Sequence, residues 1–91
     1  MRRYAINHLR IDSGCMGQFL LTPVSVPEGA TEDQAVQAGI DVGMKIERRG
    51  NPQGARWSFV GQFETDKFVD HGICLESKLI SLGLDPKKYY F

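Results

Sequence analysis

The spacing of the apolar residues changes along this chain, and that change limits the folds open to it. Alternate apolar residues are typical of a strand with one buried face, whereas apolar residues three or four positions apart are typical of a helix with one buried face. Residues 4–26 lack helical spacing, residues 44–63 alternate, and residues 31–43 and 66–82 have helical spacing. The sequence therefore predicts two β-hairpins, each followed by a helix.

Turn-forming residues mark both predicted hairpins. Asp-Ser-Gly at 12–14 joins predicted strands at 4–11 and 18–26, and Pro23 must lie at an edge or a bulge because it cannot donate a hydrogen bond to a neighbouring strand. The glycine-rich turn at 50–54 divides the alternating segment into the second hairpin. One predicted face of that hairpin carries Met44, Ile46, Trp57, Phe59 and Phe63, and the other carries Lys45, Glu47, Arg49, Arg56, Ser58 and Gln62.

Capping residues mark both predicted helices. Thr31 and Gln34 have the spacing of a capping box, and Gly43 is a natural residue to follow the last turn. Thr65 is the expected N-cap of the second helix, and Gly83 is the glycine expected just after its end. The face of the second helix that meets the sheet is predicted to carry Phe68, Gly72, Leu75, Leu79 and Leu82.

A chain of 91 residues has room for one hydrophobic core, so residues 1–91 are predicted to form a single domain. Each hairpin needs a helix to cover its apolar face. The predicted fold class is α+β, a two-layer sandwich of ββαββα order, with a four-stranded antiparallel sheet and two helices packed on one face. The residues expected to be buried in one core are Trp57, Phe59, Phe63, Phe68, Leu75 and Leu79.

Composition narrows the class of protein further. The chain is 42% hydrophobic and 24% charged, which is typical of a folded globular domain. Eleven basic residues balance eleven acidic residues, so no net charge attracts a polyanion. No stretch approaches the roughly 18 apolar residues that a membrane-spanning helix needs, so we expect no membrane partner and a cytoplasmic location.

Few residues are candidates for chemistry. His8, Cys15, His71 and Cys74 are the right types for a zinc site, but structural zinc modules place paired ligands about two to four residues apart, unlike His8 and Cys15. No glycine-rich phosphate loop is present. Cys74 and His71 could act as nucleophile and base, but a predicted helix offers them no cleft with oxyanion donors. We therefore expect no metal, no cofactor and no catalytic residue, and a small Cys/His enzyme is the weakest alternative.

The charge distribution is the most informative feature for function. The charged residues of segment 28–41 are all acidic, whereas segment 45–56 is basic apart from Glu47. The predicted second hairpin places basic side chains on the sheet face away from the core, and arginine is enriched at the hot spots of protein interfaces. The predicted partner-binding residues are Lys45, Arg48, Arg49 and Arg56. The terminus Tyr89-Tyr90-Phe91 is a second candidate surface.

The leading hypothesis is a non-catalytic protein-binding module whose partner is another protein. One form of it is a small phage or mobile-element inhibitor, anti-CRISPR-like, that acts by steric occupancy of a host or defence complex. The alternative is a nucleic-acid-binding accessory domain that uses the same basic face, although the aromatic residues suited to base stacking lie on the predicted core face. Either hypothesis is compatible with a homodimer. Replacement of Arg49 and Arg56 should impair binding with little effect on folding.

Overall fold

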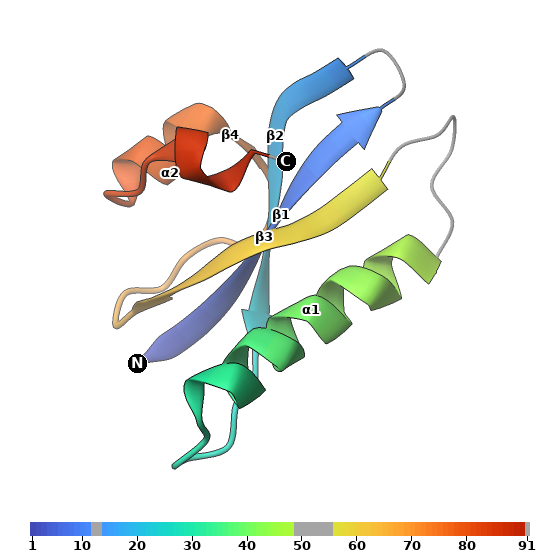
Figure 1. Cartoon of the computed structure of the whole chain (residues 1–91). Helices are drawn as coiled ribbons and strands as arrows, with labels where there is room; N and C mark the ends of the chain where they lie inside the picture. Colours follow the sequence, from blue (N-terminus) through green and yellow to red (C-terminus); the bar gives the residue numbers. More distant parts are fainter. Residues whose placement is uncertain (12–13, 49–55, 91) are drawn as a thin grey trace.

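Four antiparallel strands form one sheet with helices packed on it (Figure 1) in the computed structural model, which describes residues 1–11, 14–48 and 56–90. The strand order is β3-β1-β2-β4. Along the chain the elements are β1 (Arg2–Ile11), β2 (Gly14–Val24), α1 (Glu32–Arg48), β3 (Arg56–Thr65), β4 (Gly72–Leu75), α2 (Glu76–Ser81) and the 3-10 helix η2 (Pro86–Tyr89). The predicted α+β class, with a four-stranded antiparallel sheet and two helices, is confirmed.

The first predicted hairpin is present as β1 and β2. The two strands pair antiparallel from Arg3 opposite Val24 to Ile11 opposite Gly14. The part of β2 that pairs with β4 is 18–21, so Pro23 lies where β2 has passed the end of β4 and forms an edge, as its missing N–H requires. Residues 12 and 13 of the predicted turn lie outside the described residues.

The second predicted hairpin is wrong. Residues 44–48 continue α1 instead of forming a strand, and β3 pairs with β1. Gly43 lies within the helix and does not end it. Its missing side chain allows a close approach to the sheet, since a Cβ at position 43 would lie 2.8 Å from Oδ1 of Asn7. The start of α1 is as predicted. The N–H of Thr31 donates to Oε1 of Gln34 (2.9 Å), and the N–H of Gln34 donates to Oγ1 of Thr31 (3.2 Å).

The second predicted helix is also wrong over most of its length. Gly72–Leu75 form β4, and α2 begins only at Glu76. Gly72 has a φ of 131°, which disfavours a helix there, and the edge of β2 offers residues 72–75 the ladder of hydrogen bonds of a strand. Thr65 caps no helix, since its Oγ1 accepts from the N–H of Lys67 in a turn. Gly83 does follow the end of α2, with φ 81° and its N–H donating to the carbonyl of Ile80.

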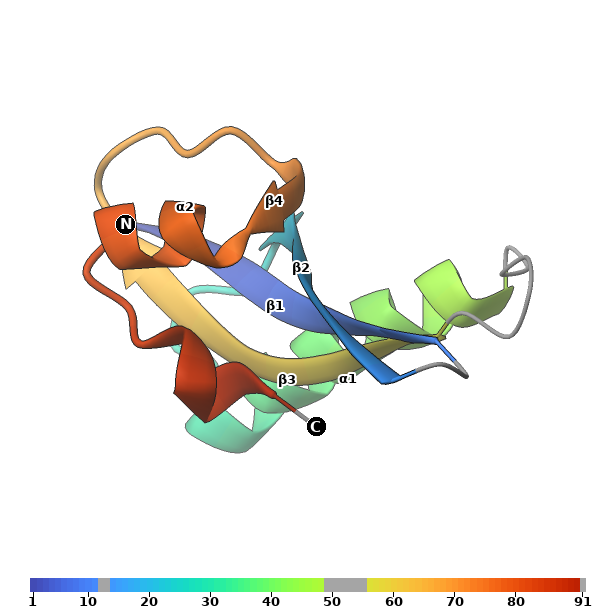
Figure 2. The ribbon, with the colours of Figure 1, turned by 90° about the horizontal axis from the view of Figure 1, so that it is seen from above.

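The two helices lie on opposite faces of the sheet, so the prediction that both pack on one face is wrong. Successive residues of a strand point to opposite faces. On β1, Ile6 packs in a cluster with Leu79 of α2, whereas its neighbour Asn7 meets Gly43 of α1. Figures 1 and 2 show α1 on one side of the sheet and α2 and η2 on the other. The sheet is therefore the middle of three layers.

Two faces also mean two sets of buried residues. The face toward α2, here called the α2 face, holds the main cluster of Tyr4, Ile6, Phe19, Leu21, Val69 and Leu79. The face toward α1, the α1 face, buries smaller residues and one tryptophan: Ala5, Val24, Ala35 and Trp57. The predicted single core is wrong. Trp57 and Leu79 are buried on different faces, and Phe68 (69% exposed) and Leu75 (58% exposed) are not buried at all.

Candidate functional site

The predicted basic sheet face does not exist as one surface. Lys45 lies on α1 with its side chain exposed, and Arg48 is the last residue of that helix. Arg56 is the first residue of β3 and is exposed. Arg49 lies outside the described residues. Two of the four predicted binding residues therefore belong to a helix, because the alternation of residues 44–48 did not produce a strand.

The helical position of Lys45 and Arg48 gives the charge pattern a structural explanation. The partial charges of a helix are positive at its N-terminus and negative at its C-terminus, so acidic residues stabilise the first turn and basic residues the last. Glu32 and Asp33 lie in the first turn of α1, and Lys45 and Arg48 lie near its other end. The acidic and basic segments of the sequence thus complement the dipole of α1.

Arg56 is different, because β3 places it beside another arginine. Arg56 lies directly opposite Arg10 of β1, and both side chains are exposed. Like charges directly opposite each other on neighbouring strands are destabilising. Among the described residues, neither arginine has an ion-pair partner. The strand pairing therefore places two like charges side by side on one face of the sheet.

An aromatic side chain covers the position on β1 that precedes Arg10 on the same face of the sheet. Tyr90 stacks on His8 with ring centroids 4.8 Å apart, and it stacks on Phe19 at 5.8 Å. His8 is fully buried beneath this stack, whereas Tyr90 is 43% exposed. His8 and Arg10 are two residues apart on β1, so they point to the same face at a spacing of roughly 7 Å. Arg10, Arg56 and Tyr90 together are here called the basic–aromatic surface.

Sequence reasoning kept the arginines and the aromatic terminus apart as rival surfaces. The structure brings Arg56 and Tyr90 to the α2 face and adds Arg10, which was not among the predicted binding residues. The missing signal was strand pairing. Arg10 acquires its role because β3 pairs with β1, and the sequence pattern had paired β3 with residues 44–49.

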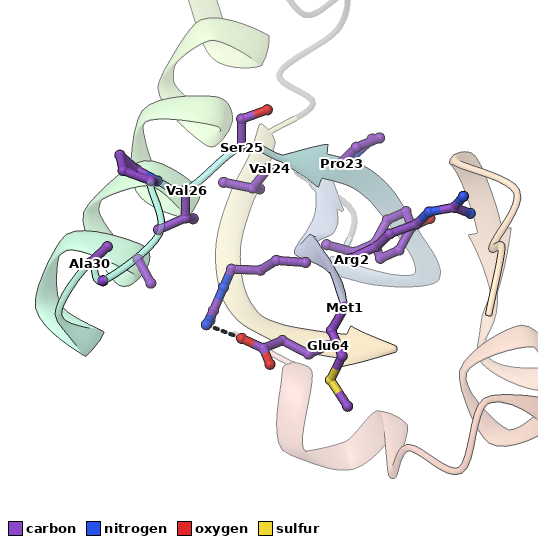
Figure 3. Close-up of a pocket in the computed structure, with 13 residues that line it drawn as sticks. Met1, Arg2, Pro23, Val24, Ser25, Val26, Ala30 and Glu64 are labelled. Atoms are coloured by element: carbon purple, nitrogen blue, oxygen red, sulfur yellow. Dashed lines mark hydrogen bonds and ion pairs between the residues drawn. The ribbon is translucent and has the colours of Figure 1, made fainter. Parts of the chain in front are cut away.

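A cavity of about 560 Å³ opens at the other end of the sheet (Figure 3). Its lining includes the start of β1, the segment from Pro23 to Pro27, Ala30 before α1, and Glu64. Arg3 forms an ion pair with Glu64 of the neighbouring strand in the lining of this cavity (Figure 3), and the guanidinium of Arg2 lies 5.6 Å from the centre of the Phe68 ring. Both arginines are thus held by groups of the chain itself, which makes this cavity a weaker candidate for an anionic ligand.

The candidate residues for chemistry are dispersed. His71 is exposed just before β4, and Cys74 is half-buried within it, so the predicted helix that placed them together is absent. Burial raises the pKa of the Cys74 thiol above its ordinary value, and the positive charge of Lys78 opposes that shift. A raised pKa lowers the thiolate fraction and therefore the reactivity at neutral pH. Within residues 1–11, 14–48 and 56–90, no cluster of three or more His, Cys, Asp or Glu side chains is suited to a metal ion.

Comparisons with protein-family models, with curated proteins and with solved structures found no significant match to this chain. In the part of the chain that the structure describes, no helix combines the length and the apolar character needed to cross a lipid bilayer.

Proposed function

We propose that this chain is a non-catalytic protein-binding module that docks an acidic protein surface on the basic–aromatic surface. One observation carries the proposal: two exposed arginines, Arg10 and Arg56, lie opposite each other without a carboxylate partner among the described residues. A partner carboxylate between the two guanidinium groups would replace their repulsion by two charge-assisted hydrogen bonds. Steric occupancy of a host or defence complex, as by an anti-CRISPR-like inhibitor, is one form such binding takes.

Tyr90 supports a protein partner. Hot spots of protein interfaces are enriched in arginine and tyrosine, and hot-spot residues cluster together within an interface. The ring of Tyr90 is held by His8 and Phe19, so little side-chain entropy is lost when its exposed part meets a partner. The surface thus combines a fixed aromatic contact with two cations.

Single-stranded nucleic acid is less well matched to the same surface. Base stacking on a sheet uses a row of exposed aromatic rings. Trp57 is buried and Phe59 is half-buried beneath α1, and Tyr90 already stacks on His8 through one side of its ring. A protein partner therefore fits this surface better than a nucleic acid.

The proposal is tested with the double variant Arg10→Glu, Arg56→Glu. Cross-linking to host proteins followed by mass spectrometry should recover a partner with the wild-type chain and lose it with this variant, because charge reversal sets like charges against the acidic partner. Since both residues are exposed, the free energy of unfolding should change by about 0.5 kcal/mol or less. Denaturant titration of both proteins checks that the variant is folded.

A charge-matched control is Arg2→Glu, Lys67→Glu, which changes the net charge equally at exposed positions outside the basic–aromatic surface. This control should keep the partner. Equal loss with both double variants would show a general charge effect and refute the proposed site. Binding of a fluorescent single-stranded oligonucleotide that weakens steeply with salt would instead favour the nucleic-acid alternative.

A further inference from the structure

Strand β4 exposes two large apolar side chains on the α1 face. Ile73 is 66% exposed and Leu75 is 58% exposed, and they lie two residues apart on the same side of the strand. Ile73 is opposite Leu20 of β2, which is half-buried. Because α1 packs mainly over β3, it leaves this part of the sheet open.

A groove beside β4 confirms that the sheet is open here. It has a volume of about 330 Å³ and lies between α1 and the strands β2 and β4. Its lining is mostly apolar and includes Leu20, Leu21 and Val42, with Lys45 and His71 among its polar residues. An apolar patch of adjacent side chains at the margin of a sheet is typical of an interaction surface.

Strand β4 also lies at one end of the strand order, where its outer backbone groups have no neighbouring strand among the described residues. Such an edge is a template for pairing with another chain. We propose that two copies of this chain associate through β4, edge to edge and antiparallel about a two-fold axis. Ile73 and Leu75 of one copy then pack beside Leu75 and Ile73 of the other, and the two sheets become continuous.

The charges that flank β4 fit a second copy. Asp70 lies two residues before the strand and Lys78 lies three residues after it, and neither has an ion-pair partner among the described residues. In an antiparallel pair related by a two-fold axis, the beginning of one β4 lies beside the end of the other. The Asp70 end of each copy therefore meets the end of its mate that carries Lys78. Glu76 lies at that end too, but it is half-buried and lies toward Gly17 of β2 in its own chain.

The strength of association follows from the size of the surface. β4 has four residues, and interfaces of small area form weak complexes. We expect a reversible dimer whose fraction rises with protein concentration. Sedimentation equilibrium of the wild-type chain over a wide range of concentrations should show mass rising toward twice that of one chain. A single-chain mass at every concentration would overturn the proposal.

Two variants and one control locate the interface. Ile73→Lys and Leu75→Lys should each weaken self-association by at least about tenfold, since each places a charge in the apolar contact of both copies. Both residues are exposed in the single chain, so thermal unfolding should change little. Ile80→Lys is the matched control, because Ile80 is 62% exposed on α2, on the other face of the sheet. Equal weakening by all three variants would overturn the assignment to β4.

The dimer is independent of the proposed function. Arg56 lies on β3, at the opposite edge of the sheet from β4. The variant Arg10→Glu, Arg56→Glu should therefore self-associate like the wild-type chain, whereas Leu75→Lys should keep the partner that the basic–aromatic surface binds. Loss of self-association in the arginine variant would contradict the proposed dimer interface.

Discussion

Helices α1 and α2 cover opposite faces of one sheet, and they are stabilised by different means. α1 has 17 residues, a capping box at Thr31 and acidic residues in its first turn. α2 has six residues, and its N-cap residue Leu75 makes no side-chain capping bond. Isolated helices shorter than about 12–15 residues are marginal in water. α1 is thus supported by local signals, whereas α2 depends on the burial of Leu79 in the main cluster.

The two helices also cover different kinds of buried side chains. On the α2 face, large side chains such as Phe19 and Leu79 are fully buried. On the α1 face, the helix approaches the sheet through glycines, and the buried amide of Asn7 has no hydrogen-bond partner among the described residues. An unpaired buried amide reduces stability. The larger buried apolar side chains therefore lie on the side of the sheet with the shorter helix.

Removal of a large side chain from the α2 face should have the largest effect. Phe19→Ala removes a fully buried ring from the main cluster and should lower the free energy of unfolding by about 3–5 kcal/mol. Phe68→Ala, in contrast, removes a ring that is 69% exposed and contacts Arg2, and it should cost about 1 kcal/mol or less. Guanidinium titration measures both. If Phe19→Ala does not fold, Phe19→Leu should show a smaller loss in the same direction; equal losses for Phe19→Ala and Phe68→Ala would contradict the comparison.

Addition of one methyl group to the α1 face should have an intermediate effect. A Cβ at Gly39 would lie 2.5 Å from Cε2 of Phe59, so the helix or the ring must shift. Gly39→Ala should lower the free energy of unfolding by about 1–2 kcal/mol, even though alanine favours a helix over glycine. The matched control is Gly17→Ala on β2, where the nearest atom to the new Cβ is Oε1 of Glu76 at 3.5 Å, an ordinary contact. Urea titration of both variants should separate them, and an unchanged Gly39→Ala protein would show that α1 is not held by this approach.

The smallest effect should be a gain in stability at the basic–aromatic surface. Arg56→Glu places a carboxylate opposite Arg10 and converts a repulsive cross-strand pair into an attractive one, worth about 0.2–1 kcal/mol. The gain should shrink at high salt, because the pair is exposed. Thermal unfolding at low and high salt measures it, with the double variant Arg10→Glu, Arg56→Glu as the control that restores repulsion. A single variant less stable than the wild type would show that the two arginines do not repel each other.

Prediction from sequence succeeded where the information was local. The capping box at Thr31 and the glycine after α2 depend on residues within a few positions of each other, and the β1–β2 hairpin joins strands that follow one another directly in the chain. The candidate site was predicted in part: Arg56 and Tyr90 were both named, but on rival surfaces. Arg10 could not be placed beside Arg56, since their contact joins strands 46 residues apart in the chain.

Amino-acid sequence alone determined the α+β class, the first hairpin and the start of α1, because side-chain spacing and capping act between near neighbours. Tertiary structure alone decided that β3 pairs with β1, that Gly72–Leu75 become a strand, and that the helices lie on opposite faces. An alternating or helical pattern states which residues share a face, but it does not state which other segment covers that face. The strand that pairs with each edge of the β1–β2 hairpin, and the helix that covers each of its faces, are determined by contacts between segments far apart in the chain.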